Sequence, residues 1–342
     1  MSSFEENVDL KPFNTFHLSA SARHFVTVGT LSEIQKVIQS PLFRDNKTLI
    51  LGGGSNILLT GDFAGLVIKN ELKGISILKE DDDRITLKVG SGENWHAFVM
   101  HCVDNGWGGI ENLSLIPGTV GAAPMQNIGA YGVEIRNTLV SVDTVDLSDG
   151  STRVFSNDDC RFGYRESIFK NELKNKYFIS SVTLRLTKRN HSINIRYGAI
   201  REILQQHQTG PVTIKAVSEA VIHIRRSKLP DPDVIGNAGS FFKNPSINAE
   251  KYDSLKNEYS DMPSFPGEDG LIKVPAGWLI EQCGWKGKSF DHIGVHKDQA
   301  LVLVNYGGGS GDQLWDLAMR IRESVNQKFG IILNPEVNVI TT

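Results

Sequence analysis

Glycines cluster directly after a short apolar segment near residue 50. Gly52-Gly53-Gly54-Ser55-Asn56 follows the run Thr48-Leu49-Ile50-Leu51, which is typical of a buried strand. Without Cβ atoms, successive glycines let backbone N–H groups turn toward a bound diphosphate. These residues favour an anion cradle. A tight turn that joins two strands is the alternative interpretation.

The loop differs from the two commonest phosphate-binding loops. The dinucleotide pattern G-x-G-x-x-G would require a glycine at position 57, where Ile57 stands. The nucleoside-triphosphate loop requires Gly-Lys followed by Ser or Thr, which this segment lacks. If the loop binds a phosphate, it is expected to do so in another way.

A second run of small residues makes a cofactor site more plausible than a simple turn. It consists of Ser114–Pro124, with Pro117-Gly118-Thr119 near its centre, and of Gln126–Gly132. Two surface loops would not need so many small apolar residues. The composition indicates a backbone that lies close to something flat or extended.

The surrounding pattern predicts the elements that must position these loops. Thr30-Leu31-Ser32-Glu33 is a capping box, so a helix is expected after Thr30. Helices are also expected from Glu93, over 213–226 and over 312–328, the last with Gly330 at its C-cap. Strands are expected at 48–51, 66–68, 84–89, 177–186 and 300–304, with a β-hairpin over 140–155 around Asp149-Gly150. Helices and strands do not alternate strictly, which favours an α+β fold.

Composition excludes several classes of protein. The chain has 342 residues, 36 basic and 39 acidic side chains, and a net charge of −3, so it has no global attraction to nucleic acid or to anionic membranes. Cys102, Cys160 and Cys283 stand far apart and fit a reducing compartment. The acidic start and the lack of a long apolar run predict a cytoplasmic protein. His292 and His296 flank Gly294 without a metal-ligand motif, so no metal site is expected.

Motifs along nearly the whole chain resemble one flavoenzyme family, the UDP-N-acetylenolpyruvoylglucosamine reductases of peptidoglycan precursor synthesis. The matching segments are 12–16, 52–56, 116–131, 162–169, 228–232, 236–245, 276–281 and 334–337. The segment between Lys243 and Lys273 resembles the long type of the family, which has an inserted loop that covers the substrate.

The resemblance implies an α+β fold with a two-part FAD-binding unit of the vanillyl-alcohol-oxidase (PCMH) type and a third, substrate-binding domain. The implied boundaries are 1–70 and 71–225 for the FAD-binding parts, 226–330 for the substrate domain, and 331–342 for a segment that returns to the active site. The implied cofactors are FAD and NADPH. The implied reaction reduces the enolpyruvyl ether of UDP-N-acetylglucosamine to UDP-N-acetylmuramate, with hydride from flavin N5 to C3 and protonation at C2. The expected partner is this small molecule alone, bound by a monomer.

The resemblance also assigns roles to individual residues. Arg165 corresponds to the residue that binds the substrate carboxylate, Ser240 to the acid at C2, and Glu336 to a catalytic carboxylate that polarises the substrate or fixes Arg165. The implied cofactor-binding residues are Gly52, Gly53, Gly54, Ser55, Asn56, Pro117, Gly118, Thr119, Gly121, Ala122, Gln126, Asn127, Gly129, Ala130 and Tyr131. The implied substrate-binding residues are Tyr164, Tyr197, Lys228, Asn244, Phe265 and Gln299.

One position departs from the family. Where its members often have tyrosine in a Pro-x-Tyr-Pro setting, this chain has Pro263-Ser264-Phe265-Pro266. Phe265 keeps an aromatic face and lacks the hydroxyl, which costs about 0.5–1.5 kcal/mol of affinity if that hydroxyl binds substrate.

Two other functions stay open from the sequence. A flavoprotein oxidase or dehydrogenase of the same broad fold would reduce its flavin with its own substrate instead of NADPH. A nucleotide-sugar sensor would bind the sugar without any flavin, although a sensor has no need of an acid such as Ser240.

Overall fold

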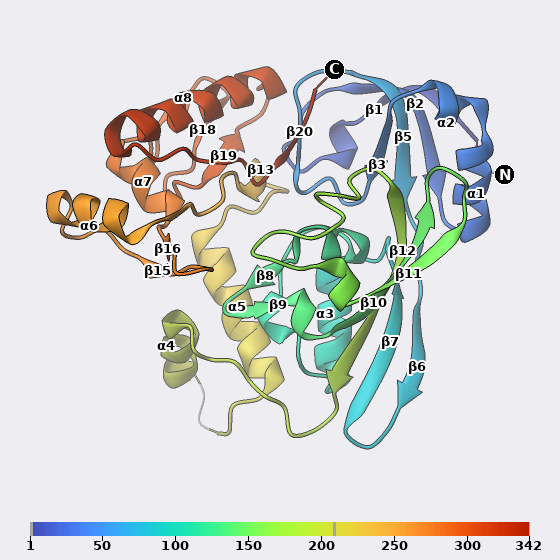
Figure 1. The fold of residues 1–342 in the computed structure, drawn as a ribbon, viewed down its shortest axis with the longest axis horizontal. Helices are drawn as coiled ribbons and strands as arrows, with labels where there is room; N and C mark the ends of the chain where they lie inside the picture. Colours follow the sequence, from blue (N-terminus) through green and yellow to red (C-terminus); the bar gives the residue numbers. More distant parts are fainter. Residues whose placement is uncertain (1–2, 208–209, 342) are drawn as a thin grey trace. The chain divides into compact units, whose positions relative to one another are not determined.

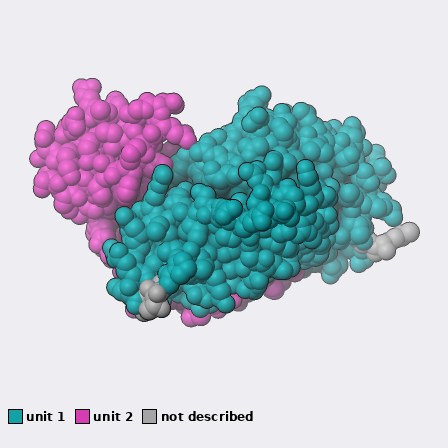
Figure 2. Space-filling model, turned by 90° about the horizontal axis from the view of Figure 1, so that it is seen from below, with its two compact units in different colours: residues 1–8, 22–53, 64–227 teal, residues 9–21, 54–63, 228–342 magenta. Residues whose placement is uncertain are grey.

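The computed structural model of the chain describes residues 3–207 and 210–341. It contains two compact units, coloured separately in Figure 2. Unit 1 comprises residues 1–8, 22–53 and 64–227, and unit 2 comprises residues 9–21, 54–63 and 228–342. Helices and strands are mixed in both units (Figure 1), which agrees with the predicted α+β class. The domain boundaries at residues 70, 225 and 330 stay predictions.

A small β/α layer begins unit 1. Its four-stranded sheet has the order β1-β2-β5-β3. The strands are β1 (Glu5–Asp9), β2 (Ser21–Val28), β5 (Phe63–Asn70) and β3 (Thr48–Leu51). The predicted capping box is confirmed at the start of α1 (Leu31–Gln39), where Thr30 Oγ1 accepts a hydrogen bond from the Glu33 N–H. The buried face of α1 packs on β2 and β5, and the short helix α2 (Pro41–Asp45) follows it.

A five-stranded antiparallel sheet forms the centre of unit 1, in the order β11-β10-β12-β7-β6. Its strands are β6 (Ile75–Glu80), β7 (Arg84–Gly90), β10 (Leu139–Asp146), β11 (Thr152–Ser156) and β12 (Tyr177–Thr187). Alternate residues of β7 are buried, as its period-2 pattern predicts. The β10–β11 hairpin is confirmed; its connection spans 147–151, with Gly150 at a φ of 78°.

Three helices complete unit 1: α3 (Trp95–Asp104), α4 (Gly198–His207) and α5 (Ile214–Lys228). The predicted start of α3 at Glu93 is two residues too early, because Asn94 is its N-cap and accepts a hydrogen bond from the Ala97 N–H. The small-residue loops contain the 3₁₀ turns η2 (Glu111–Leu113), η3 (Val120–Ala122), η4 (Pro124–Gln126) and η5 (Ile135–Asn137), and the two-stranded hairpin β8 (Gly129–Ala130) and β9 (Val133–Glu134). The 3₁₀ turn η1 (Lys11–Phe13) lies near the N-terminus, and η6 (Asp158–Cys160) follows β11.

Unit 2 is built on an antiparallel sheet of order β13-β19-β18-β17. The strands are β13 (Gly236–Ser240), β17 (Ser289–Phe290), β18 (Ile293–Val295) and β19 (Val302–Asn305). The predicted amphipathic helix is confirmed as α8 (Gly311–Phe329), whose Leu314, Leu317 and Ile321 are fully buried. It lies over β18 and β19 (Figure 1) and shares one core with the short helix α7 (Ala276–Gln282).

Two smaller sheets complete unit 2. The segment between Lys243 and Lys273 forms β14 (Ser246–Ile247), α6 (Ala249–Glu258), β15 (Phe265–Pro266) and β16 (Ile272–Lys273), with the strands in the order β14-β16-β15. Leu255 of α6 and the nearby Met262 belong to the main core of the unit. The C-terminal strand β20 (Asn338–Ile340) pairs in parallel with β4 (Ile57–Leu59).

No helix within residues 3–207 and 210–341 combines the length and apolar character needed to cross a membrane.

Candidate active site

The first glycine loop approaches the second small-residue loop very closely in unit 1. A Cβ atom on Gly53 would lie 2.9 Å from the Gly118 Cα, and one on Gly52 would lie 2.7 Å from the Thr119 Oγ1. Real Cβ atoms essentially never show contacts this short, and the contact of Gly53 is with backbone atoms, so a larger residue at position 53 would force the two loops apart. The structure therefore brings together two loops that the sequence predicted to share one function.

The second loop is fixed by the segment that precedes α3. Gly118 O accepts a hydrogen bond from the Trp95 N–H at 3.0 Å, and the N–H groups of Val120 and Gly121 donate to Glu93 O and Ser91 O at 2.9 and 2.8 Å. These bonds leave Pro117 and Ala122 exposed on the loop. The backbone of this loop is thus set by α3 and β7, which belong to the core of unit 1.

The first loop continues into unit 2, where Gly54 cannot be replaced without strain. Its φ is 62°, and an added Cβ would overlap the Phe13 carbonyl. Asn56 Nδ2 donates to Glu336 O at 3.3 Å, and Asn56 O accepts from the Asn338 N–H at 3.0 Å. The end of the glycine loop is therefore attached to the C-terminal segment.

Arg165 lies on a tight two-residue turn in unit 1. Gly163 and Glu166 exchange both backbone hydrogen bonds, at 3.1 and 3.2 Å, and so leave Tyr164 and Arg165 at the tip. Arg165 has a φ of 56°, a left-handed conformation that costs a non-glycine residue of order 1 kcal/mol or more. Its Nη2 donates to Gly129 O of β8 at 2.8 Å, and its Cζ lies 5.8 Å from the centre of the Tyr164 ring. The guanidinium is therefore held beside the predicted cofactor loop.

Ser240 and Glu336 are brought together within unit 2. Ser240 ends β13 at an irregularity between Asn237 and Ser240, next to Gly239 with its φ of 69°. The next residue, Phe241, accepts the Glu336 N–H at 2.8 Å on its carbonyl oxygen. A further bond from the Lys243 N–H to Asn334 O at 2.9 Å extends this pairing. The C-terminal segment thus runs alongside the residues that follow Ser240.

The predicted substrate-binding residues occupy varied positions. Lys228, the last residue of α5, is exposed and begins the main segment of unit 2. In the same unit, Phe265 is 56% exposed on β15, and Gln299 precedes β19. Asn244 Oδ1 accepts the Ala276 N–H at 2.9 Å, so this oxygen caps the start of α7 and the amide nitrogen is the group that can face a ligand. In unit 1, the ring of the exposed Tyr197 meets the Tyr131 ring edge-on, with centroids 5.1 Å apart.

Comparison with known proteins decides the family. An FAD binding domain model matches residues 22–156, and a UDP-N-acetylenolpyruvoylglucosamine reductase C-terminal domain model matches residues 231–340. The UDP-N-acetylenolpyruvoylglucosamine reductase of Flavobacterium johnsoniae is 48% identical over 336 residues, which cover 98% of this chain and 99% of that one. That of Chromobacterium violaceum is 47% identical over 334 residues, which cover 97% and 98%. This chain belongs to the UDP-N-acetylenolpyruvoylglucosamine reductase family.

A solved structure of the reductase family shares the fold. The UDP-N-acetylenolpyruvylglucosamine reductase of Thermus caldophilus superimposes with a TM-score of 0.69 at 22% identity and covers 99% of both chains. The FAD-binding unit expected from the sequence is confirmed by the FAD binding domain match. The protein is an FAD-dependent oxidoreductase.

The glycine loops of this reductase fit FAD. Their close approach offers a surface of backbone without side chains, as a diphosphate requires. Within the described part of the chain, the N–H groups of Gly53, Gly54 and Ser55 form no hydrogen bond with another residue, so they are available to phosphate oxygens. In unit 1, the phosphates of the cofactor would be held by Gly52, Gly53, Thr119 and the 3₁₀ turn η3.

Three residues that brace the second loop of this reductase, Leu115, His96 and Arg225, were not predicted from the sequence to have this role. Leu115 has a φ of 57° and is held on both sides: its N–H donates to His96 Nδ1 at 3.0 Å, and its carbonyl accepts from Arg225 Nε at 3.1 Å. Burial raises the pKa of the Tyr131 phenol, and the charge of Arg225 opposes this rise. Burial, then Arg226 and Arg225, lowers the pKa of His96, which suits an imidazole that accepts a hydrogen bond.

Cysteine and metal chemistry have no support among the described residues. Burial raises the pKa of the Cys160 thiol to about 12, so it is not a thiolate nucleophile, and burial also raises the pKa of Cys102. Within residues 3–207 and 210–341, no group of three or more His, Cys, Asp and Glu side chains has a geometry that could hold a metal ion.

Proposed function

We propose that this protein uses NADPH to reduce the enolpyruvyl ether of UDP-N-acetylglucosamine to UDP-N-acetylmuramate. The observation that carries the proposal is the backbone hydrogen bond from Glu336 to Phe241, the residue that follows Ser240. Membership of the reductase family supports the same reaction. When bound, FAD supplies a two-electron carrier that takes a hydride from NADPH and delivers it to C3 of the enolpyruvyl group. The cytoplasmic location and the monomeric state remain predictions that accompany this proposal.

Arg165 stabilises the substrate carboxylate in this proposal. Hydride addition to C3 places negative charge on that carboxylate, and a guanidinium that stays charged can neutralise it with two parallel hydrogen bonds. One N–H group of Arg165 already bonds Gly129 O, which fixes the direction of the side chain. A guanidinium carries five N–H donors in a planar fork, which is the geometry that a bidentate contact with a carboxylate needs.

Ser240 protonates C2, and Glu336 assists through the substrate carboxylate. Serine is a weak acid, so it can act here only because C2 becomes strongly basic once hydride has reached C3. Glu336 either shares a proton with the substrate carboxylate or orients Arg165, and both roles require it to approach a second charged group.

The UDP portion is bound by the remaining assigned residues. Lys228 suits the diphosphate as a point charge, and the amides of Asn244 and Gln299 suit the polar groups of the uridine or the sugar. The exposed ring of Phe265 stacks on the uridine, and Tyr197 donates one hydrogen bond to a phosphate. Tyr164 packs near the flavin or the nicotinamide.

The test separates the two half-reactions in single variants. We expect Ser240→Ala to retain FAD and to be bleached by NADPH, whereas reoxidation by the enolpyruvyl sugar slows about 10²–10⁴-fold, the usual contribution of a general acid. Arg165→Ala is expected to slow the same step by about 10²–10³-fold, as for loss of a group that stabilises developing charge. Ser32→Ala, at an exposed position of α1, is the matched control. Normal turnover in Ser240→Ala would refute the assignment of the acid.

A further inference from the structure

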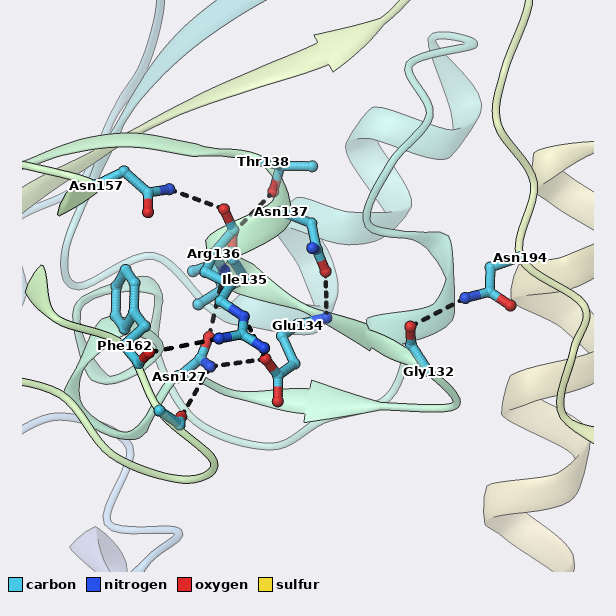
Figure 3. Close-up of polar contacts among 11 residues, drawn as sticks. Asn127, Gly132, Glu134, Ile135, Arg136, Asn137, Thr138, Asn157, Phe162 and Asn194 are labelled. Carbon is cyan, nitrogen blue, oxygen red and sulfur yellow. Dashed lines mark hydrogen bonds and ion pairs between the residues drawn. The ribbon is translucent and has the colours of Figure 1, made fainter. Parts of the chain in front are cut away.

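Asn127 lies at the centre of a polar network that includes Glu134 and Arg136 (Figure 3). Its side chain is fully buried, and its backbone is left-handed with a φ of 44°. Nδ2 donates to Glu134 Oε2 at 2.9 Å and to Gly163 O at 3.0 Å, while Oδ1 accepts from the Arg136 N–H at 3.3 Å. The amide therefore makes three hydrogen bonds to two segments of unit 1, the β9–η5 segment with Glu134 and Arg136 and the turn that begins at Gly163.

These two segments are the ones that hold Arg165. Gly163 is the first residue of the turn that carries Arg165 at its tip, so the bond from Asn127 fixes the base of that turn. Glu134 pairs with Gly129 in the β8–β9 hairpin, and Gly129 O is the acceptor of the Arg165 guanidinium. Asn127 thus connects the backbone of Arg165 to the hairpin that receives its side chain.

The chemistry of the network requires an amide at this position. Glu134 Oε2 and Gly163 O are both acceptors, and Glu134 also pairs with Arg136 Nε at 2.7 Å. A neutral group with two N–H donors can join two acceptors, whereas a carboxylate would repel both. Asparagine also tolerates the left-handed backbone that the turn after η4 adopts.

We infer that Asn127 is a positioning residue that sets the direction of the Arg165 guanidinium toward the substrate carboxylate. This inference rests on the proposed function, in which Arg165 binds that carboxylate. The family resemblance implies that Asn127 is a cofactor-binding residue, and the inference concerns its side chain, whose polar atoms are both engaged within the protein. If the Arg165 guanidinium points in the wrong direction, it binds the substrate carboxylate more weakly, even though every catalytic group is still present.

Two variants isolate the side chain from the backbone. Asn127→Gly keeps the left-handed conformation without strain and removes only the amide. Asn127→Asp keeps an acceptor for the Arg136 N–H and removes the two donors. The measurement is calorimetric titration of the oxidised, FAD-loaded protein with the enolpyruvyl sugar in the absence of NADPH, so that no turnover occurs. We expect both variants to weaken binding about tenfold or more, the usual loss for a charge-assisted hydrogen bond.

A double-mutant cycle distinguishes positioning from a general structural role. In an Arg165→Ala background, Asn127→Gly is expected to change the dissociation constant by less than about twofold, because the group that it positions is absent. Asn157→Ala is the matched control: it removes bonds to Arg136 O and Leu139 O at 2.8 and 2.7 Å and touches neither Gly163 nor Glu134. We expect this control to bind the sugar like the unmodified protein.

The outcomes separate this inference from the proposed function. If the unmodified protein does not bind the sugar and is not reoxidised by it, the proposed function fails. If it binds, and Asn127→Gly binds equally well or loses affinity by the same factor with and without Arg165, the positioning role is wrong. Should Asn127→Asp fail to fold, Asn127→Gly alone decides the question.

Discussion

The contact between the two glycine loops leads to a sharp prediction for Gly53→Ala. The new Cβ would lie 2.9 Å from the Gly118 Cα and 3.4 Å from its carbonyl carbon, and both are backbone atoms that cannot rotate away. To regain ordinary contact, the loops must separate by about 0.5 Å. If the loops form the diphosphate cradle, this separation displaces the N–H groups that bind FAD.

The magnitude follows from the cost of overpacking. An added methyl group in a closed contact costs about 1–3 kcal/mol, which corresponds to a dissociation constant for FAD about 5- to 150-fold higher. The assay removes FAD, adds it back in increments, and follows the visible absorbance and the quenching of flavin fluorescence. We expect weaker rebinding by Gly53→Ala and a smaller stabilisation of its melting temperature by saturating FAD.

Gly29→Ala is the matched control for this experiment. Gly29 lies in the same unit, and its added Cβ would lie 3.7 Å from Glu33 Oε2, an ordinary van der Waals distance. It should bind FAD like the unmodified protein. If Gly53→Ala also binds FAD normally, or if it melts earlier without FAD while its FAD affinity is unchanged, the loop contact is only structural and the cradle is refuted.

Further predictions concern His96 and Asn244. The pKa of His96 is lowered in the folded state, so the unfolded chain binds more protons below about pH 6.5 and stability falls as the pH falls through that range. His96→Asn keeps an acceptor for the Leu115 N–H but does not titrate. Its melting temperature should therefore fall less between about pH 7 and pH 5 than that of the unmodified protein. An equal fall in both proteins would exclude His96 as the source of the stability loss at low pH. Asn244→Ala should lose about 0.5–2 kcal/mol of unfolding free energy, because the Ala276 N–H at the start of α7 loses its acceptor, whereas Asn244→Asp should keep that stability. Urea denaturation measures the difference, and equal stability of the two variants would contradict the capping role.

Local patterns predicted much of the fold. The capping box at Thr30, the helix over 312–328 with Gly330 as its C-cap, and the β10–β11 hairpin are confirmed because each depends on interactions between residues close in sequence. Helix α6, within the segment described only as an inserted loop, was not predicted. Its apolar residues are few, and Leu255 is the one buried residue that attaches it to the core.

The hydrogen bonds that attach the C-terminal segment to the site could be found only from the structure. The bonds that join Glu336 to Phe241 and Asn56 to Glu336 link residues far apart in sequence, and no local pattern encodes a register of this kind. The family resemblance indicated Arg165, Ser240 and Glu336 by matching motifs, and their roles stay proposals. It also placed Asn127 among the cofactor-binding residues, and it gave no sign that the side chain of this residue is engaged within the protein.

One measurement tests the central claim most directly: the visible spectrum of the purified protein under anaerobic conditions, with NADPH added first and the UDP-enolpyruvyl sugar second. The account predicts oxidised flavin bands that bleach with NADPH and return in proportion to the added sugar. A flavin that NADPH cannot bleach would contradict it and favour an oxidase or dehydrogenase that reduces its flavin with another substrate. A colourless protein that FAD cannot reconstitute would contradict the assignment of the glycine loops to the cofactor.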